Sequence, residues 1–199
     1  MHFEEEFTYH VYNRSNNTVF KTKENYIYFL KKFRQYILPY VDVLSWCLMP
    51  NHFHFMLVPN TKATKLINKP HLPNTQVLSS QFGIFLSAYT KAYNKQNNRR
   101  GSLFSHNTKA VVLNDISNGK INTKNDYSET CFRYIHQNPL NSDLVDNIYD
   151  WEFSSYLDYS EKRNGDLINK ELCFKMINID VENFKDWSLA NIEDIDKIK

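Results

Sequence analysis

Residues 46–58 read Trp46-Cys47-Leu48-Met49-Pro50-Asn51-His52-Phe53-His54-Phe55-Met56-Leu57-Val58, an apolar run that contains a Pro-Asn pair and two histidines. The Pro-Asn pair predicts a tight turn that joins two antiparallel strands. Side chains alternate between the two faces of an extended strand, so His52 and His54 share one face. The phenylalanines at positions 53 and 55 share the other face, which has the composition of a core. This stretch therefore predicts a strand with one apolar face and one histidine face.

Two histidines on one face can bind a metal ion together. At a rise of about 3.3 Å per residue, the backbone positions of His52 and His54 lie roughly 7 Å apart, so both imidazoles can reach one point above the sheet. Neutral imidazole is the commonest metal ligand. Two nitrogens are too few for a complete site, so a third ligand has to come from elsewhere in the chain. The alternative is that both histidines are half-buried polar residues of an ordinary strand, and spacing alone leaves this open.

The composition of the 199 residues indicates one globular protein, with 42% hydrophobic and 15% aromatic side chains. Its apolar runs are shorter than the ~18 residues of a membrane span. The acidic start at residues 4–6 lacks the features of a signal peptide, so we expect no membrane association. Cys47, Cys131 and Cys173 are odd in number and widely spaced, which indicates reduced thiols in a cytoplasmic protein.

The net charge of +2 conceals a strong asymmetry along the chain. Residues 1–140 hold 17 Lys and Arg against 8 Asp and Glu, whereas residues 141–199 hold 7 against 14. A basic body followed by an acidic segment suggests a polyanion-binding domain with a tail that does not bind the polyanion. The alternative is that these charges only solvate helix faces. We place the boundary at 158, with a main domain over 1–158 and an acidic, mainly helical extension over 159–199.

Hydrophobic periodicity predicts a mixed α+β fold. Strands are expected at 7–12, 41–48, 52–58 and 109–113. Helices are expected at 23–37, 75–94 and 126–137, the second capped by Asn74 or Thr75 and the third stopped by Pro139. The segment 59–74 is expected to be a basic loop, and the segment 114–125 a polar loop.

Several side chains are candidates for contact with nucleic acid. A basic segment surrounds the Gly101 turn, where an exposed Phe104 next to cationic side chains would suit a single-stranded nucleic acid groove. Arg14, beside a predicted turn at 13–17, is a candidate phosphate contact, although an ordinary surface arginine explains it equally well. The candidates are Arg14, Lys91, Lys95, Arg99, Arg100, Phe104 and Lys109. His10, in the first strand, is interpreted as a structural histidine.

The predicted third helix carries Tyr134 and Asn138 one turn apart on the same face. Tyr134 has a nucleophilic oxygen, and Asn138 has a neutral amide oxygen suited to a hard divalent cation. If this face lies over the histidine strand, it supplies a third ligand and an attacking hydroxyl together. A metal ion held by His52, His54 and Asn138 would favour phosphate oxygens and water. Pattern alone also allows Tyr134 to be a core tyrosine.

A phenol is mostly protonated at neutral pH, because its pKa is near ~10. It becomes an effective nucleophile when a metal ion polarises a phosphodiester and offsets the developing charge. The product would be a covalent tyrosyl-phosphate ester, and a released hydroxyl would mark the new DNA end. Because the ester conserves the energy of the bond, the step can be reversed to rejoin DNA.

Two motifs lie eighty residues apart, Leu48-Met49-Pro50-Asn51-His52-Phe53-His54 and Tyr134-Ile135-His136-Gln137-Asn138-Pro139. Together they closely resemble the REP-associated tyrosine transposases, which are single-tyrosine HUH endonucleases named for a His-hydrophobe-His motif. The resemblance covers roughly residues 7–157 and extends to Tyr9-His10-Val11 with Asn13-Arg14, to Gly101-Ser102-Leu103-Phe104, and to Trp151 with Ser154-Ser155-Tyr156. Either motif alone is a weak signal, whereas both in this order and at this separation are specific.

The resemblance implies a ferredoxin-like HUH fold, in which an antiparallel sheet carries the histidines and helices pack against it. It implies that His52, His54 and Asn138 bind Mg²⁺ or Mn²⁺, and that Tyr134 forms a 5′-phosphotyrosine link while freeing a 3′-hydroxyl. The implied partner is single-stranded DNA with an adjacent hairpin, as in repetitive extragenic palindromes, in a bacterial, nucleoid-associated setting. Related insertion-sequence transposases act as dimers, whereas the resemblance also allows a monomer in this branch, so monomer and homodimer stay open.

Two features depart from the family. The segments 59–74 and 114–125 are long for the compact core, and the acidic region after residue 160 has no clear equivalent. Two other functions stay open at this point. One is a domesticated DNA-binding protein that binds single strands or hairpins without turnover. The other is a metal hydrolase that uses water, which is disfavoured because no carboxylate base lies near the histidines in sequence.

Overall fold

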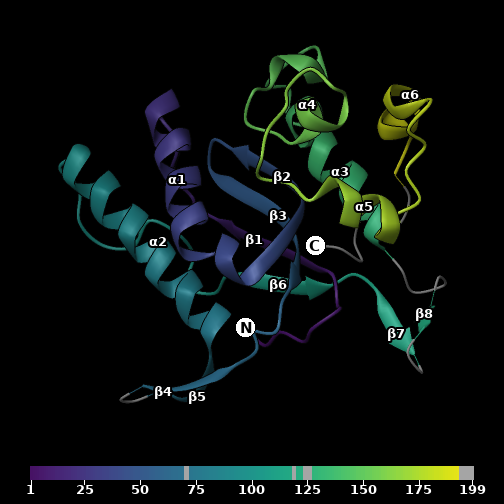
Figure 1. The fold of residues 1–199 in the computed structure, drawn as a ribbon. Coiled ribbons are helices and arrows are strands. Elements are labelled where there is room, and N and C mark those ends of the chain that lie inside the picture. Colours follow the sequence, from purple (N-terminus) through teal and green to yellow (C-terminus); the bar gives the residue numbers. More distant parts are fainter. Residues whose placement is uncertain (70–71, 118–119, 123–126, 193–199) are drawn as a thin grey trace.

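A computed structural model describes residues 1–69, 72–117, 120–122 and 127–192 (Figure 1). A four-stranded sheet forms its centre, in the order β2-β3-β1-β6. All neighbouring strands in it are antiparallel. The strands are β1 (Tyr9–Arg14), β2 (Val41–Met49), β3 (His52–Pro59) and β6 (Lys109–Val112). The predicted α+β class with an antiparallel sheet is confirmed, and the Pro-Asn turn joins β2 to β3.

The phenylalanine face of the sheet packs against two helices, α1 (Lys23–Tyr36) and α2 (Val77–Gln96). Figure 1 shows both helices on the same side of the sheet. The ring of Phe33 stacks on Phe55 with centroids 4.1 Å apart, and Phe29 lies 5.3 Å from Phe53. These side chains belong to one buried cluster, so the apolar face of β3 is a core face as predicted.

The opposite face of the sheet, which carries the histidines, is covered by α3 (Ser128–Asn141). Cys131 and Ile135 of this helix belong to a second buried cluster, with Met56 of β3. The prediction that Pro139 stops this helix is wrong, because the helix continues to Asn141. A proline in the last turn forfeits only one backbone hydrogen bond, and its carbonyl still accepts from the backbone of Leu144 at 3.0 Å.

The two segments expected to be loops contain short paired strands instead. Strand β4 (Leu66–Lys69) pairs with β5 (Leu72–Gln76), and β7 (Asp115–Ser117) pairs with β8 (Lys120–Asn122). Parts of the predicted loops, at 70–71, 118–119 and 123–126, lie outside the described residues. Because β5 runs directly into α2, the N-cap of that helix is Gln76, and the prediction of Asn74 or Thr75 is wrong.

The chain beyond α3 returns to the edge of β2. It contains the short helices η3 (Ile148–Asp150), α4 (Tyr156–Tyr159), α5 (Lys170–Met176) and α6 (Phe184–Leu189), while η1 (Leu38–Tyr40) follows α1. Backbone hydrogen bonds join Leu48 to Phe153 and Ser155 to Trp46. Cys173 and Phe184 are buried in the cluster under α3. Described helix after residue 159 is therefore limited to two short segments that pack on the body, and the boundary at 158 stays a prediction.

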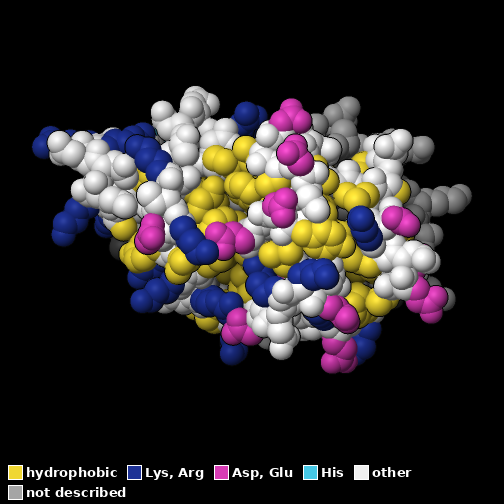
Figure 2. Space-filling model, turned by 90° about the horizontal axis from the view of Figure 1, so that it is seen from above, with side chains coloured by type: hydrophobic (Ala, Val, Ile, Leu, Met, Phe, Trp, Pro, Cys, Tyr) yellow, Lys and Arg dark blue, Asp and Glu magenta, His cyan; other side chains and the backbone are white. Residues whose placement is uncertain are grey.

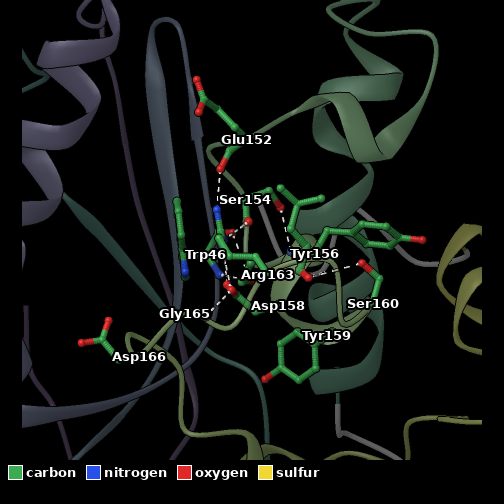
Figure 3. A network of polar contacts seen from close by, with 12 residues as sticks. Trp46, Glu152, Ser154, Tyr156, Asp158, Tyr159, Ser160, Arg163, Gly165 and Asp166 are labelled. Atoms are coloured by element: carbon green, nitrogen blue, oxygen red, sulfur yellow. Dashed lines mark hydrogen bonds and ion pairs between the residues drawn. The ribbon is translucent and has the colours of Figure 1, made fainter.

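A network of polar contacts connects residues 152–165, which belong to the returning chain after α3, to β2 (Figure 3). The buried carboxylate of Asp158 accepts from Nε and Nη2 of Arg163, each at 2.7 Å, and from the backbone N–H of Gly165 at 3.0 Å. Arg163 also donates to the carbonyls of Glu152 and Ser154, and its guanidinium lies 5.3 Å from the ring of Trp46 on β2. One ion pair thus ties several loop segments to the sheet.

Charges of both signs are mixed on the face shown in Figure 2, where they surround exposed hydrophobic side chains. The exposed ion pairs Lys23–Glu152 and Arg34–Asp166 join the first helix to the returning chain. The charge asymmetry of the sequence therefore does not make this face uniformly basic. Among the described residues, every helix is too short or too polar to span a membrane.

Candidate active site

The register of the sheet puts both histidines of β3 next to side chains of β1. His52 lies opposite Arg14, and His54 lies opposite Tyr12. The two imidazole rings are 4.9 Å apart between centroids and almost perpendicular. His54 is buried, with 4% of its surface exposed, whereas His52 at the end of the strand is partly exposed. The strand alternation therefore brings both imidazoles to one place, as the sequence predicts.

Helix α3 brings Tyr134 and Asn138 to the same place. The ring of Tyr134 lies 5.5 Å from the ring of His54, in an edge-on arrangement. Asn138 donates from Nδ2 to the backbone carbonyl of Tyr134 at 2.9 Å, and its amide oxygen takes no part in that hydrogen bond. Side-chain hydrogen bonds with Asn138 affect the pKa values of both His52 and Tyr134. The four side chains from two distant motifs thus meet at one site.

Burial keeps both imidazoles neutral. Desolvation, followed by the positive charge of Arg14, lowers the pKa of His52 to about 4, and a hydrogen bond with Asn138 only partly offsets this. Desolvation, and then the neighbouring histidines His10 and His52, lowers the pKa of His54 well below its usual value. A neutral imidazole retains a lone pair, so both residues are ready to bind a cation near neutral pH.

The donor set fits a hard divalent cation. His54 Nε2 is buried and has no hydrogen-bond partner among the described residues. His52 Nδ1 lies 2.6 Å from Asn51 Oδ1, which as an acceptor fixes the ring proton there and leaves the lone pair on Nε2. The described residues contain no cluster of three or more His, Cys, Asp or Glu arranged for a metal ion. The amide oxygen of Asn138 is a group of another kind that could complete such a donor set.

Tyr134 is half-buried beside these ligands. Desolvation raises the pKa of its phenol, whereas a hydrogen bond with Asn138 and the charge of Arg14 act in the opposite direction. The phenol is therefore protonated at neutral pH, and additional positive charge near it would favour its ionised form. The same arginine that lowers the pKa of His52 thus also favours charge on Tyr134.

A cavity of about 360 Å³ opens beside His52. Exposed Arg14, at the end of β1, lies on its wall with polar side chains of the turn that follows it. Its other lining residues include Asn16, Asn17, Asn51, Ser142 and Leu144. Of the predicted DNA-binding residues, Arg14 is the one that the structure brings to the histidines.

The other predicted DNA-binding residues do not line the cavity beside His52. Lys91 and Lys95 are exposed on α2, which covers the phenylalanine face of the sheet, and Arg100 is exposed just beyond it. Arg99 is engaged internally, because its guanidinium donates to Asn94 Oδ1 and to the carbonyl of Ser102. Lys109 is exposed on β6, opposite Tyr12.

The prediction of an exposed aromatic at Phe104 is wrong. Its side chain is 8% exposed and lies in the core cluster, with ring centroids 5.7 Å from Phe53 and 6.1 Å from Tyr89. The glycine turn places the aromatic against the sheet, so the neighbouring basic side chains have no exposed ring beside them at this position. A stacking contact between Phe104 and a base is therefore not supported.

Sequence reasoning missed two side chains of β1 that line the site, His10 and Tyr12. The ring of His10 is 5.0 Å from His54 and 6.1 Å from Tyr134, and the ring of Tyr12 is 5.9 Å from His54. Both point to the histidine face because they are two positions apart on a strand that pairs with β3. Their alternation was visible in the sequence, but the pairing of β1 with β3 was needed to place them.

Comparison with known proteins gives a structural match. No family model matches the chain, and no curated protein does. A solved structure of a REP-associated tyrosine transposase bound to a REP hairpin matches with a TM-score of 0.54 and 13% sequence identity. The match covers 85% of this chain and 92% of that chain. This chain has the fold of a REP-associated tyrosine transposase. The transposase fold that the sequence motifs led us to expect is thereby confirmed.

Proposed function

We propose that this protein is a metal-dependent single-stranded DNA endonuclease and strand transferase of the REP-associated tyrosine transposase family. It would cleave near a hairpin and form a covalent 5′-phosphotyrosine intermediate. The observation that carries the proposal is the meeting of Tyr134 with two neutral imidazoles and an amide oxygen on the histidine face of the sheet. The fold match to a transposase bound to a REP hairpin supports hairpin DNA as the partner.

Each side chain has a defined task in this reaction. The phenol oxygen of Tyr134 attacks the phosphorus, a P–O bond to tyrosine forms, and the bond from phosphorus to the 3′ oxygen breaks. The phenolic proton leaves to solvent, and the departing 3′ oxygen takes up a proton. His52, His54 and Asn138 would hold Mg²⁺ or Mn²⁺, which polarises the phosphodiester and offsets its developing charge. Arg14, beside His52, would bind the phosphate and favour the ionised form of Tyr134.

A cleavage assay with two labels tests the proposal. Protein and Mn²⁺ are mixed with single-stranded hairpin oligonucleotides from around its own gene, labelled at the 5′ or the 3′ end, and analysed on a denaturing gel. We expect a covalent adduct that carries only the 3′-side fragment. Cleavage without an adduct would identify water as the nucleophile. Binding of the hairpin without cleavage would favour the alternative of a domesticated DNA-binding protein.

Removal of a metal ligand should weaken cation binding and spare the fold. We expect His52→Ala and Asn138→Ala each to lower the affinity for Mn²⁺ by at least about tenfold, since loss of even an outer-shell partner has effects of that size. Calorimetry on the protein without DNA measures this. His106→Ala is the matched control, because His106 is exposed in the loop before β6. Unchanged Mn²⁺ affinity in His52→Ala would contradict the assignment of the ligands.

The affinity for single-stranded DNA should fall steeply with salt, because phosphate contacts release counterions. Each contact contributes about 0.7 to the slope of log affinity against log salt on a single strand. We therefore expect Arg14→Ala to make this slope shallower by about 0.7, as measured by fluorescence anisotropy. Lys185→Ala, at an exposed lysine of the acidic C-terminal region, should leave the slope unchanged. A flat salt response of the wild type would remove the electrostatic basis of the proposal.

A further inference from the structure

His10 on β1 is in direct contact with a proposed metal ligand. Its Nε2 lies 2.8 Å from Nδ1 of His54, and its side chain is only 1% exposed. We propose that His10 is a positioning residue that fixes the tautomer of His54, so that His54 directs the lone pair of Nε2 at a divalent cation. This inference rests on the proposed function, because it assigns His10 a task in the same metal site.

The proton count of this pair allows two arrangements. A single proton lies between His10 Nε2 and His54 Nδ1, since each nitrogen can be either a donor or an acceptor. If His10 donates, His54 carries its proton on Nε2, and that nitrogen cannot bind a cation. If His54 donates, its Nε2 carries a lone pair, and His10 carries its own proton on Nδ1. Only the second arrangement makes His54 a ligand.

The surroundings of His54 favour the second arrangement. Its Nε2 is buried without a hydrogen-bond partner among the described residues. A proton on this nitrogen would leave a buried N–H donor unpaired, which folded proteins avoid. A lone pair in the same position can be satisfied by a cation, provided that one binds between the histidines and Asn138. The orphaned atom therefore points to a ligand rather than a donor.

His52 provides an internal comparison. Its Nδ1 lies 2.6 Å from Asn51 Oδ1, an amide oxygen that can only accept, so its proton has to be on Nδ1. In both histidines of β3, Nδ1 thus contacts an outer partner and Nε2 is left for the site. Metal-binding histidines commonly donate their second ring nitrogen to such a partner, which sets the tautomer and the ring orientation. His10 would accept the Nδ1 proton of His54, as Asn51 accepts the Nδ1 proton of His52.

The position of His10 is itself well defined. It lies in β1, one of the two inner strands of the sheet, opposite Met56 of β3 and Val111 of β6. The ring of Tyr12 stacks against it with centroids 4.7 Å apart and an interplanar angle of 29°. Because backbone pairing on both sides and an aromatic neighbour hold the ring, His10 can present Nε2 to His54 in a constant geometry. A rigid outer partner is what a precise ligand orientation requires.

Histidine nitrogen NMR tests the tautomer without metal or DNA. Long-range ¹H–¹⁵N spectra of the protein distinguish protonated from unprotonated ring nitrogens. We expect His54 to be protonated at Nδ1 and unprotonated at Nε2 in the wild type. His10→Gln should keep this state, since the amide oxygen of glutamine can accept the same hydrogen bond, whereas His10→Phe should leave His54 as a mixture of tautomers. A wild-type His54 protonated at Nε2 would overturn the proposal.

Mn²⁺ affinity, measured by calorimetry, provides the second readout. We expect His10→Phe to weaken binding by about 10-fold to 100-fold and His10→Gln to remain within about threefold of the wild type. Thermal unfolding verifies that each variant is folded, and His10→Leu replaces His10→Phe if the larger ring does not fit. Equal Mn²⁺ affinity in the wild type and the folded apolar variant would overturn the proposal, as would a wild type that binds no Mn²⁺. If the variants differ in Mn²⁺ affinity as expected but the wild type does not cleave DNA, the proposed function is refuted and the role of His10 in cation binding is not.

Discussion

Replacing Tyr134 with phenylalanine should abolish the covalent adduct between protein and DNA. We expect adduct formation to fall by at least about 10³-fold, because the change removes the one oxygen that would form the bond to phosphorus and nucleophile losses in other enzymes are at least this large. The ring remains in place, half-buried 5.5 Å from His54, so Mn²⁺ and hairpin affinities should stay within about twofold. The measurement is the denaturing-gel assay with 5′-labelled and 3′-labelled oligonucleotides.

Tyr12→Phe is the matched control for this experiment. Tyr12 is a second half-buried tyrosine of the same site, with its ring 5.9 Å from His54, and burial raises the pKa of its phenol as it does for Tyr134. Tyr12 lies on the strand rather than on α3 and lacks the hydrogen bond with Asn138 that lowers the pKa of Tyr134. We expect the Tyr12→Phe variant to retain the adduct. An adduct that persists in Tyr134→Phe and disappears in Tyr12→Phe would reassign the nucleophile.

The parts of the site that were predictable from sequence are those set by local periodicity. Alternation along a strand places His52 beside His54, and one helical turn places Tyr134 beside Asn138. Neither the strand alternation nor the helical periodicity predicts that α3 packs on the histidine face. That step came from the resemblance between the two motifs and the transposases, and the ring contact of Tyr134 with His54 agrees with it. The sequence does not show that His10 contacts His54, because the two residues lie on different strands and are distant in sequence.

The predictions for the segment 59–74 and for Phe104 were wrong because both depend on contacts between residues that are distant in sequence. Paired strands such as β4 and β5 are short, and their formation depends on long-range contacts that periodicity does not detect. Gln76 shows one of these contacts, because its side chain hydrogen-bonds both backbone groups of Phe3, near the N-terminus. Phe104 was expected at the surface because it follows a run of basic residues, yet the fold inserts it between two helices and the sheet. Local composition did not reveal either tertiary contact.

The second large effect that we expect is on stability, from Asp158→Ala. Asp158 is 1% exposed, and removal of its carboxylate leaves the Arg163 guanidinium without its counter-charge and the Gly165 N–H without its acceptor. Breaking a buried pair costs about 3–5 kcal/mol. Because about a third of the Arg163 side chain is exposed, water can solvate the remaining charge, and we expect about 2–4 kcal/mol. For a domain of this size the melting temperature should fall by roughly 5–15 °C.

The matched control for Asp158→Ala is Glu171→Ala. Its ion pair with Lys175 has a similar length, 2.6 Å, but both side chains are mostly exposed, so the loss of stability should be far smaller than in Asp158→Ala. The double variant Asp158→Leu with Arg163→Met should recover part of the stability, because it removes both charges and leaves apolar volume next to Trp46. Urea unfolding at equilibrium measures the stability of all three variants.

If Asp158→Ala unfolds at the same urea concentration as Glu171→Ala, the network in Figure 3 does not hold the returning chain to β2. A loss confined to Asp158→Ala would show that this one buried pair stabilises the chain that follows α3, and through its contacts with β2 the sheet that bears the histidines.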